Sequence, residues 1–260
     1  MPQQASSIGR VVDGAAFFFD RSVLDKLAYR LRGEYAGAQP FPHVVLDDFL
    51  PAEAAARLLD EFPPIDAFVS DGPEGGNKVG KYDSTLVTEL SPFIRNLLAQ
   101  LCCSPFVDFL ESLSGVSGLV SDPHGTDHAL RHFVRGGSLA LHADFNTQKS
   151  LGLERRVNII LYLNRNWPAD YGAALEFWDR DMTACAKSIS PVFNRAVVFS
   201  PTSDAYHGFP DPVRCPEGES RKSLQLYYYA APRSGVALHG TTRWHAQNSL
   251  LTRLRRRLTR

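Results

Sequence analysis

The chain has 260 residues with 28 lysines and arginines against 28 aspartates and glutamates, so its formal net charge is zero. This balance argues against nucleic acid or an anionic membrane as a partner, and no run of 18 apolar residues predicts a membrane span. The four cysteines form no C-x-x-C pair, so neither a zinc knuckle nor a disulfide framework is indicated. We therefore expect a cytoplasmic protein with one sizeable domain, and the sequence leaves its oligomeric state open.

The first 130 residues are predicted to form a helix-rich support region. A helix is expected over 22–31, and the segment FPHVVLDDFLP (41–51) has the apolar cluster of a strand. Its final proline is suited to open a helix, AEAAARLLDEF, which ends before Pro63 and Pro64. Apolar residues at helical spacing predict one or two more helices over 91–113.

A glycine-rich and charged segment, SDGPEGGNKVGKYD, occupies residues 70–83. It carries little apolar surface that could fix it in place, so we expect a long mobile loop. Such a loop is either a lid over a site or a plain connection.

From about residue 131 the sequence changes character. Short runs rich in β-branched and aromatic residues follow one another, separated by Gly, Pro, Asn and Asp: RHFVRGGSLALHAD, VNIILYLN, ALEFWD, AVVFSP and SLQLYYYA. This pattern predicts an all-β sandwich or barrel over 131–233. The remaining residues, 234–260, end in SLLTRLRRRLTR and are expected to form a basic helix or tail.

Two histidines and one carboxylate in this region could hold a metal ion. His142 and Asp144 are two residues apart, so on a strand their side chains point to the same side. Taken alone, the pair is better interpreted as a histidine hydrogen-bonded to a nearby aspartate. His207, which follows a predicted strand 65 residues later, completes the two-histidine, one-carboxylate triad that leaves coordination positions open on non-haem Fe(II).

Arg221 and Ser223 extend this set toward a second ligand. A dicarboxylic cosubstrate such as 2-oxoglutarate needs the metal for its keto-acid end and a cation for its distal carboxylate. An arginine binds a carboxylate through two parallel hydrogen bonds and stays charged. Ser223 lies on the same strand face and can add a hydroxyl donor.

The order H-x-D, distal His, then R-x-S resembles the prolyl-4-hydroxylase-like branch of the 2-oxoglutarate/Fe(II)-dependent dioxygenases. The resemblance extends to the segments that contain these residues, and FPHVVLDDFLP is similar to an N-terminal element common in bacterial members. It covers about half of the chain densely. One departure is Gly172-Ala173-Ala174, where relatives usually carry two glycines.

The resemblance implies a single oxygenase domain over 1–260, mainly β with supporting α. Its core is a double-stranded β-helix, a jelly-roll or cupin-like barrel, with the N-terminal helices packed on one sheet. Fe(II), 2-oxoglutarate and O2 are the implied cofactor and cosubstrates.

The resemblance also implies roles residue by residue. His142, Asp144 and His207 take the metal and are catalytic, whereas Arg221, Ser223 and Tyr162 bind 2-oxoglutarate. Tyr162 has plain barrel core as its alternative. His132 is a candidate pocket residue with a core histidine as the alternative. If the segment 70–83 folds over the mouth of the site, the expected substrate contacts within it are Lys78, Lys81 and Tyr82.

The function expected from sequence is hydroxylation, or a related oxidation, of an unactivated C–H bond, with decarboxylation of 2-oxoglutarate to succinate. A small-molecule biosynthetic intermediate or amino acid is the expected substrate. The alternatives are a protein prolyl hydroxylase, a cupin-like metal enzyme that does not use 2-oxoglutarate, and a non-catalytic β-sandwich binding module.

Overall fold

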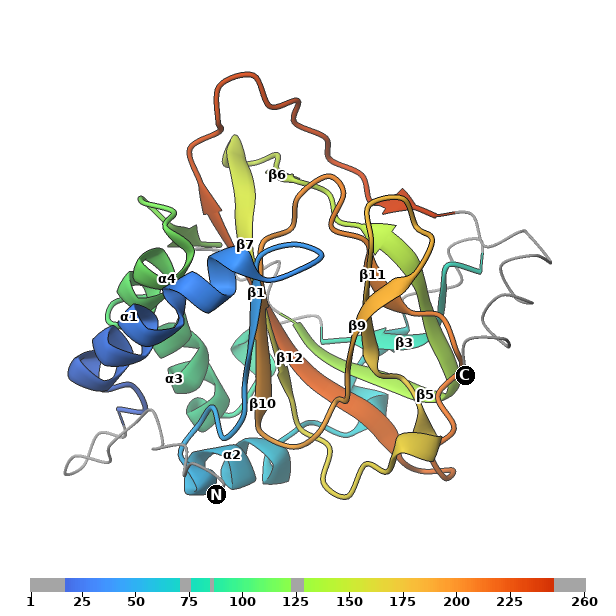
Figure 1. The fold of residues 1–260 in the computed structure, drawn as a ribbon. Helices are drawn as coiled ribbons and strands as arrows, with labels where there is room; N and C mark the ends of the chain where they lie inside the picture. The colour runs from blue at the N-terminus through green and yellow to red at the C-terminus, as the bar shows by residue number, and fades with distance from the viewer. Residues whose placement is uncertain (1–16, 71–75, 85–86, 123–128, 246–260) are drawn as a thin grey trace, which may run out of the picture.

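The computed structural model describes residues 17–70, 76–84, 87–122 and 129–245. Within them the chain forms one curled antiparallel sheet of thirteen strands, with four α-helices on one side of it (Figure 1). The helices are α1 (Arg21–Gly37), α2 (Ala52–Asp60), α3 (Pro92–Leu101) and α4 (Phe106–Ser114). Short 3-10 helices lie at Ile65–Ala67, Val87–Glu89 and Ala169–Tyr171. The mainly β class with supporting helices is confirmed.

The sheet runs in the order β1-β10-β7-β12-β5-β11-β8-β9, and every pairing in it is antiparallel. These strands are β1 (His43–Leu46), β10 (Arg195–Phe199), β7 (Leu153–Tyr162), β12 (Ser220–Ala230), β5 (Ala129–Ala143), β11 (His207–Phe209), β8 (Leu175–Trp178) and β9 (Cys185–Ile189). Five short strands join its margins: β2 (Val69–Ser70), β3 (Lys78–Asp83), β4 (Val120–Ser121), β6 (Thr147–Gln148) and β13 (Arg243–Trp244).

The central strands are buried on both faces, and alternate side chains serve two different purposes. Along β12, Leu224, Leu226 and Tyr228 face the helices and join the main hydrophobic core. The intervening residues Gln225 and Tyr227 line a cavity on the other face. Because side chains alternate along a strand, the same hydrophobic run both packs the helices and lines the inside of the curled sheet.

Two of the helices, α1 and α3, begin at residues whose side chains cap them. The side chain of Asp20 accepts a hydrogen bond from the backbone N–H of Val23 at the start of α1. Ser91 caps α3 in the same way, with a proline at the first helical position, a position where its missing N–H costs nothing. The Tyr228 hydroxyl then donates to the Leu101 carbonyl at 2.8 Å, which links the end of α3 to the sheet.

One segment among the described residues, Pro92–Ser114, is long and apolar enough to be a candidate membrane span by composition alone. The structure divides it into α3 and α4, and both helices pack against the sheet. More than half of its most apolar window is buried inside the molecule. Packing in the core therefore accounts for its apolar character.

The prediction of a mobile loop over 70–83 is wrong for its second half. Lys78–Asp83 forms strand β3, which pairs with β5 and with β2. Gly80, one of the glycines that suggested mobility, allows this pairing, because it has φ +58° and an added Cβ there would lie 3.1 Å from the Cα of Gly137. Residues 71–75 lie outside the described part of the chain, as do residues 246–260 of the predicted basic tail.

His132 lies on the opposite face of β5 from the cavity. Its Nε2–H donates to the Pro63 carbonyl at 3.1 Å, and its Nδ1 accepts from Ser220 at 2.7 Å. The rings of Phe62 and Phe68 pack edge-on against it. The core alternative is therefore the one that the structure supports, since Arg131 and Phe133 take the cavity side.

Burial makes His132 a source of acid sensitivity. Desolvation lowers the pKa of His132 to about 4, from an ordinary value of 6.5. The unfolded chain therefore binds one more proton than the folded chain between those values, so stability should fall as the pH drops from about 6.5 to 4, by up to about 1.4 kcal/mol per pH unit. Urea unfolding at pH 7 and pH 5 should show a smaller loss for His132→Gln than for the wild type, and an equal loss would contradict this account.

Candidate active site

The three predicted metal ligands meet inside the curled sheet. His142 is near the end of β5, Asp144 is the first residue after that strand, and His207 is the first residue of β11. The register of β11 on β5 places His207 opposite His142. Their ligand atoms all lie within 4.8 Å of one another, and all three residues are buried. Sequence positions 65 residues apart are thus joined by one strand pairing.

Hydrogen bonds fix both imidazoles in the orientation a metal requires. The Nδ1–H of His142 donates to the Ala140 carbonyl at 2.9 Å, and that of His207 donates to the Ala205 carbonyl at 2.9 Å. Each Nε2 is therefore left with a free lone pair that points into the site. Burial, followed by the nearby His142, lowers the pKa of His207 to about 4, so this ligand is neutral at pH 7.

The donor set fits a divalent transition metal. The two Nε2 atoms lie 3.5 and 3.6 Å from the nearer Asp144 oxygens. Two metal–ligand bonds of about 2.1 Å can bridge any separation below about 4.2 Å. Two imidazoles and one carboxylate on one side of an ion suit Fe(II) and leave positions for further ligands.

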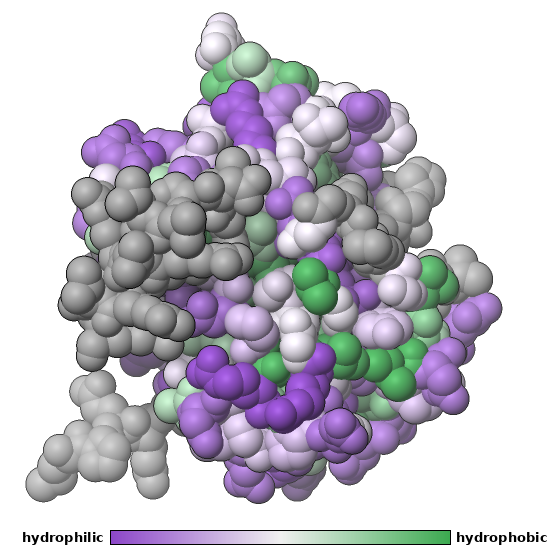
Figure 2. Space-filling model, turned by 90° about the vertical axis from the view of Figure 1, so that its right-hand side faces the viewer, coloured by the Kyte–Doolittle hydropathy of each residue, from purple (hydrophilic) through white to green (hydrophobic). Residues whose placement is uncertain are grey.

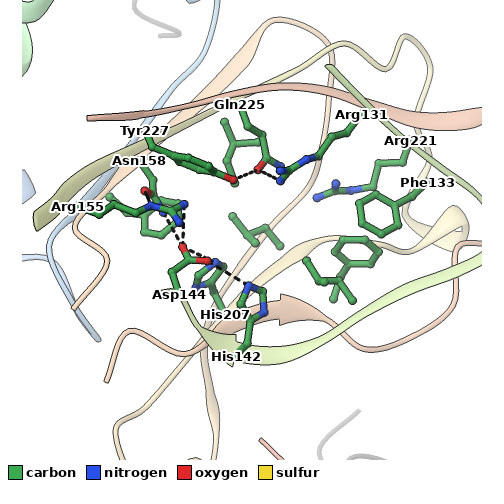
Figure 3. A pocket seen from close by; sticks show the side chains of 15 residues that line it. Arg131, Phe133, His142, Asp144, Arg155, Asn158, His207, Arg221, Gln225 and Tyr227 are labelled. Atoms are coloured by element: carbon green, nitrogen blue, oxygen red, sulfur yellow. Dashed lines mark hydrogen bonds and ion pairs between the residues drawn. The ribbon is translucent and has the colours of Figure 1, made fainter. Parts of the chain in front are cut away.

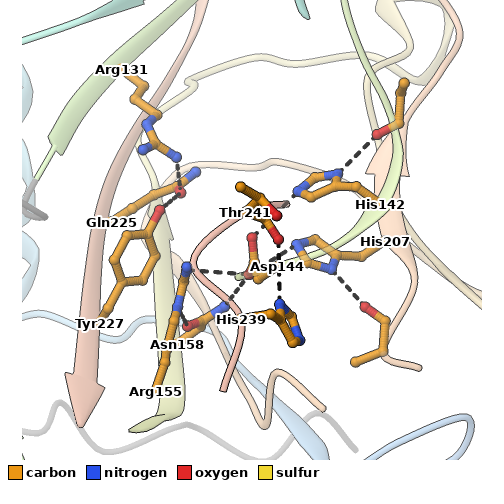
Figure 4. A network of polar contacts seen from close by, with 12 residues as sticks. Arg131, His142, Asp144, Arg155, Asn158, His207, Gln225, Tyr227, His239 and Thr241 are labelled. Atoms are coloured by element: carbon orange, nitrogen blue, oxygen red, sulfur yellow. Dashed lines mark hydrogen bonds and ion pairs between the residues drawn. The ribbon is translucent and has the colours of Figure 1, made fainter. Parts of the chain in front are cut away.

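Asp144 is held from behind by two side chains that the sequence did not single out. Arg155 lies 3.2 Å from Asp144 Oδ2, and the Asn158 amide donates to the same oxygen at 2.8 Å (Figure 4). Burial would raise the pKa of Asp144, but Arg155 and the two histidines hold it well below its usual range. The carboxylate is therefore ionised and oriented before any metal binds.

We expect Arg155→Met to weaken the metal site without removing a ligand. The variant keeps the side-chain volume but leaves a buried carboxylate with one fewer partner, and changes to such supporting residues typically reduce metal affinity about 10- to 100-fold. Chelator competition for Co²⁺ at pH 7 measures this directly, with Arg131→Met as the matched control because Arg131 lines the same cavity but pairs with Asp83. Equal affinity in the Arg155 variant and the wild type would contradict the role.

Arg221 lies across the cavity from the triad (Figure 3). Its Nε donates to the Ala173 carbonyl at 3.0 Å and its Nη2 to the Tyr162 hydroxyl at 3.1 Å. The residue is only 2% exposed, and within the described structure no carboxylate pairs with it. Arg131 and Arg155, which line the same cavity, do pair with carboxylates. An unneutralised buried guanidinium is costly unless an anion completes its surroundings.

Tyr162 and Ser223 supply the other groups such an anion needs. The Tyr162 oxygen accepts from Arg221, so its own proton remains to be donated. Burial raises the pKa of Tyr162 although Arg221 opposes this, which keeps the phenol protonated. The Ser223 hydroxyl is buried without a hydrogen-bond partner. The three residues predicted to bind 2-oxoglutarate are therefore neighbours in the structure, with Ser223 opposite Tyr162 in the strand pairing, and each offers a buried donor that a carboxylate could accept from.

Ala173, which lies where the resembling family usually carries a glycine, is in contact with Arg221. Ala173 has φ +56°, a left-handed conformation that favours glycine, and it is buried. Its carbonyl nonetheless accepts from Arg221. The chain therefore keeps the backbone shape that a glycine would give more easily, and the arginine stays anchored.

The cavity between triad and arginine, including its open mouth, encloses about 430 Å³. Its apolar walls come from Phe133, Leu139, Ile160, Leu175, Phe199 and Phe209, and its polar groups include Gln225 and Tyr227. Lys81 lies on the cavity side of β3, opposite Phe133, and pairs with Asp83. Tyr82 is opposite His132 on the other face and packs against the helix-side core.

Gln225 and Tyr227 were not identified from sequence as cavity residues, although their spacing along the strand could have predicted this. They follow Arg221 and Ser223 at intervals of two along one strand, so the same alternation that paired the first two predicts all four on one face. Lys78 is opposite the cavity residue Leu139 in the strand pairing, and its role as a substrate contact stays a prediction.

Comparison with known proteins agrees with this geometry. Residues 128–229 match the model of the 2OG-Fe(II) oxygenase superfamily. Prolyl 3-hydroxylase OGFOD1 of Mus musculus is 27% identical over 197 residues, which cover 73% of this chain. The chain spans about a third of that relative's length.

Three solved structures show the same fold. A prolyl hydroxylase from Trichoplax adhaerens, in complex with a hypoxia inducible factor peptide, matches with a TM-score of 0.59 at 15% identity, over 80% of this chain and 91% of that one. A Pseudomonas putida prolyl-4-hydroxylase matches with a TM-score of 0.58 at 17% identity, over 78% and 99%. HygX from Streptomyces hygroscopicus, with nickel and 2-oxoglutarate bound, matches with a TM-score of 0.53 at 9% identity, over 79% and 93%.

The family match includes all of the residues that the geometry brings together, from His142 to Ser223. The superfamily's name gives iron and 2-oxoglutarate as cofactor and cosubstrate, which favours an oxygenase over a binding module or a cupin without 2-oxoglutarate. The part of the chain that carries the triad and Arg221 thus matches the model of the 2OG-Fe(II) oxygenase superfamily, and the fold of the chain is the one seen in the two prolyl hydroxylases.

Proposed function

We propose that this enzyme hydroxylates a prolyl residue in a protein or peptide. When iron and 2-oxoglutarate are bound, they supply with O2 the oxidation that converts a C–H bond to C–OH, while 2-oxoglutarate is converted to succinate and CO2. The observation that carries the chemistry is the buried triad facing an unpaired Arg221 across one cavity. The relative named as a prolyl 3-hydroxylase supports the substrate class, in preference to the small molecule that the sequence alone favoured.

The charges in the cavity also support an uncharged target. Arg131 and Arg155 already have carboxylate partners. Once Arg221 binds the distal carboxylate of 2-oxoglutarate, each cavity arginine has an anionic partner. A free amino acid would bring both a carboxylate and an ammonium group into this space, and burying unpaired charges is costly. A prolyl ring within a peptide brings neither.

Arg155 offers a contact for the peptide backbone. Its Nη1 is buried without a hydrogen-bond partner, and its Cζ lies over the Tyr227 ring, 3.3 Å from the ring centre. A peptide carbonyl can accept from such a donor, and satisfying a buried donor is favourable. Arg155 would thus orient Asp144 on one side and the substrate chain on the other. The apolar walls of the cavity help to exclude water from the reacting carbon.

The test is a substrate screen with mass detection. Purified enzyme with Fe(II), 2-oxoglutarate and O2 is given a library of proline-containing peptides and, separately, free L-proline. We expect a gain of one oxygen on a prolyl residue of at least one peptide sequence, with succinate formed in equal amount. Oxidation of free amino acids alone would refute the peptide substrate class while leaving the oxygenase chemistry in place.

The proposed location is the cytoplasm. All four cysteines are free thiols, as expected in a reducing compartment. Fractionation of the source cells, with detection of the native protein, tests this directly.

A further inference from the structure

The C-terminal segment 233–245, here named the strap, runs along the strand that carries the metal ligands. The backbone N–H of Asn146 donates to the His239 carbonyl at 3.1 Å, and that of His245 donates to the Leu141 carbonyl at 2.9 Å. Between them β13 pairs with β5, with Trp244 opposite His142. The strap lies beyond the residues that match the family model.

Two buried side chains hold the strap in place. Arg233 binds Glu154 through three hydrogen bonds to side-chain oxygens of 2.6–3.3 Å and one from its backbone N–H, and the Glu154 side chain is 1% exposed. The Asn146 amide donates to the Ala237 carbonyl at 3.0 Å and accepts from the His239 N–H at 2.6 Å. Asn146 is two residues after Asp144, so the segment that carries this metal ligand also positions the strap. Figure 4 shows His239 and Thr241 of the strap beside Asp144.

This placement brings an indole to the metal site. Trp244 is opposite His142 in the strand pairing, so both side chains point to the cavity side of β5. The ring centres of Trp244 and His142 are 5.0 Å apart. The His142 ring also contacts the His207 ring, with 4.4 Å between their centres. Trp244 is only partly buried, and Lys78 of β3 lies 5.9 Å from its ring centre. Trp244 therefore lies against the ring of His142 and remains partly exposed to solvent.

The described surface on one face of the molecule mixes hydrophobic and hydrophilic residues. In Figure 2, which views the barrel side of the molecule, small hydrophobic groups lie among polar residues over the described surface. A single large aromatic beside the metal can therefore contribute a sizeable share of apolar contact to a substrate that enters there.

We propose that Trp244 is a specificity-determining residue, a wall of the substrate mouth against which the peptide segment next to the target prolyl residue packs. The inference rests on the proposed prolyl hydroxylation for the identity of the substrate. The strap supplies this wall from outside the family's common core, so the peptide preference of this enzyme depends in part on residues 233–245.

The position of Trp244 can be tested without any substrate. The three tryptophans are Trp167, Trp178 and Trp244, and protein labelled with 5-fluorotryptophan should give one ¹⁹F resonance for each. Paramagnetic Co²⁺ broadens a nearby resonance with the inverse sixth power of distance. The resonance that is lost in Trp244→Phe should be the one most broadened by Co²⁺. If the Trp167 or Trp178 resonance broadens more, the strap does not lie at the metal site and the proposal fails.

The role in substrate selection needs kinetics on the best peptide from the screen. Trp244→Ala should raise KM for the peptide about 10- to 30-fold, the loss typical of a large aromatic contact, while the 2-oxoglutarate requirement changes less than threefold. Trp244→Phe should recover part of the loss, and Trp167→Phe should behave as wild type. An unchanged peptide KM, or an equal rise for both substrates, would overturn the role of Trp244.

Failure of the two proposals can be told apart. If the wild type oxidises no peptide, prolyl hydroxylation fails and Trp244 loses its proposed ligand with it. If the wild type hydroxylates a peptide and Trp244→Ala does so with the same KM, only the specificity role is wrong.

Discussion

His207→Ala and His142→Ala should each abolish both iron retention and turnover. Two remaining ligands do not hold Fe(II) tightly, and each imidazole is already fixed by a backbone carbonyl, so no neighbouring histidine can replace it without rebuilding a strand. We expect less than about 1% of wild-type succinate formation, since removal of a catalytic metal typically costs several kcal/mol of transition-state stabilisation. Metal content after dialysis and succinate release measure the two effects.

The matched control is His132→Gln, which removes a buried imidazole that faces away from the cavity. It should retain iron and turn over when folded. If either triad variant keeps near-normal succinate formation, the ligand assignment is wrong.

Arg221→Ala should raise the 2-oxoglutarate requirement far more than the requirement for the oxidised substrate. The loss of a charge-assisted contact in a buried site typically costs 2–5 kcal/mol, which corresponds to a rise of about 30-fold or more. The Tyr162 hydroxyl and the orphaned Ser223 hydroxyl remain in the variant, so some binding should persist. Steady-state kinetics with each substrate varied in turn provide the measurement.

Arg221→Lys separates charge from geometry. It keeps a cation but loses the planar fork and the Nε bond to Ala173, so its 2-oxoglutarate requirement should fall between those of the wild type and Arg221→Ala. Equal rises in both substrate requirements for the alanine variant would indicate a purely structural arginine.

The metal and cosubstrate residues could be predicted from sequence because their geometry is local. H-x-D and R-x-S place side chains on one face of a strand by the period of two alone. Only His207 needed tertiary information, which the register of β11 on β5 supplies. The same period explains the error at His132, since a shift of one residue moves a side chain to the other face, and Arg131 and Phe133 take the cavity side.

Strand β3 and the strap could not be predicted from sequence, because their conformations depend on the distant segments that they pair with and not on their own composition. The β3 sequence KVGKYD contains a glycine and charges, which are poor strand formers. It becomes a strand because it pairs with β5, where Asp83 pairs with Lys81 and Arg131. The strap has no periodic apolar pattern, and it is held by Asn146 and Glu154, which lie about 90 and 80 residues earlier.

The most direct test of the iron and 2-oxoglutarate site is anaerobic absorption spectroscopy. Wild-type protein given Fe(II) and then 2-oxoglutarate should develop a weak metal-to-ligand charge-transfer band in the green region. The band should be absent in His207→Ala, and it should need about 30-fold or more additional 2-oxoglutarate in Arg221→Ala. A wild-type protein that binds Fe(II) but develops no such band at saturating 2-oxoglutarate would contradict the assignment of this cavity.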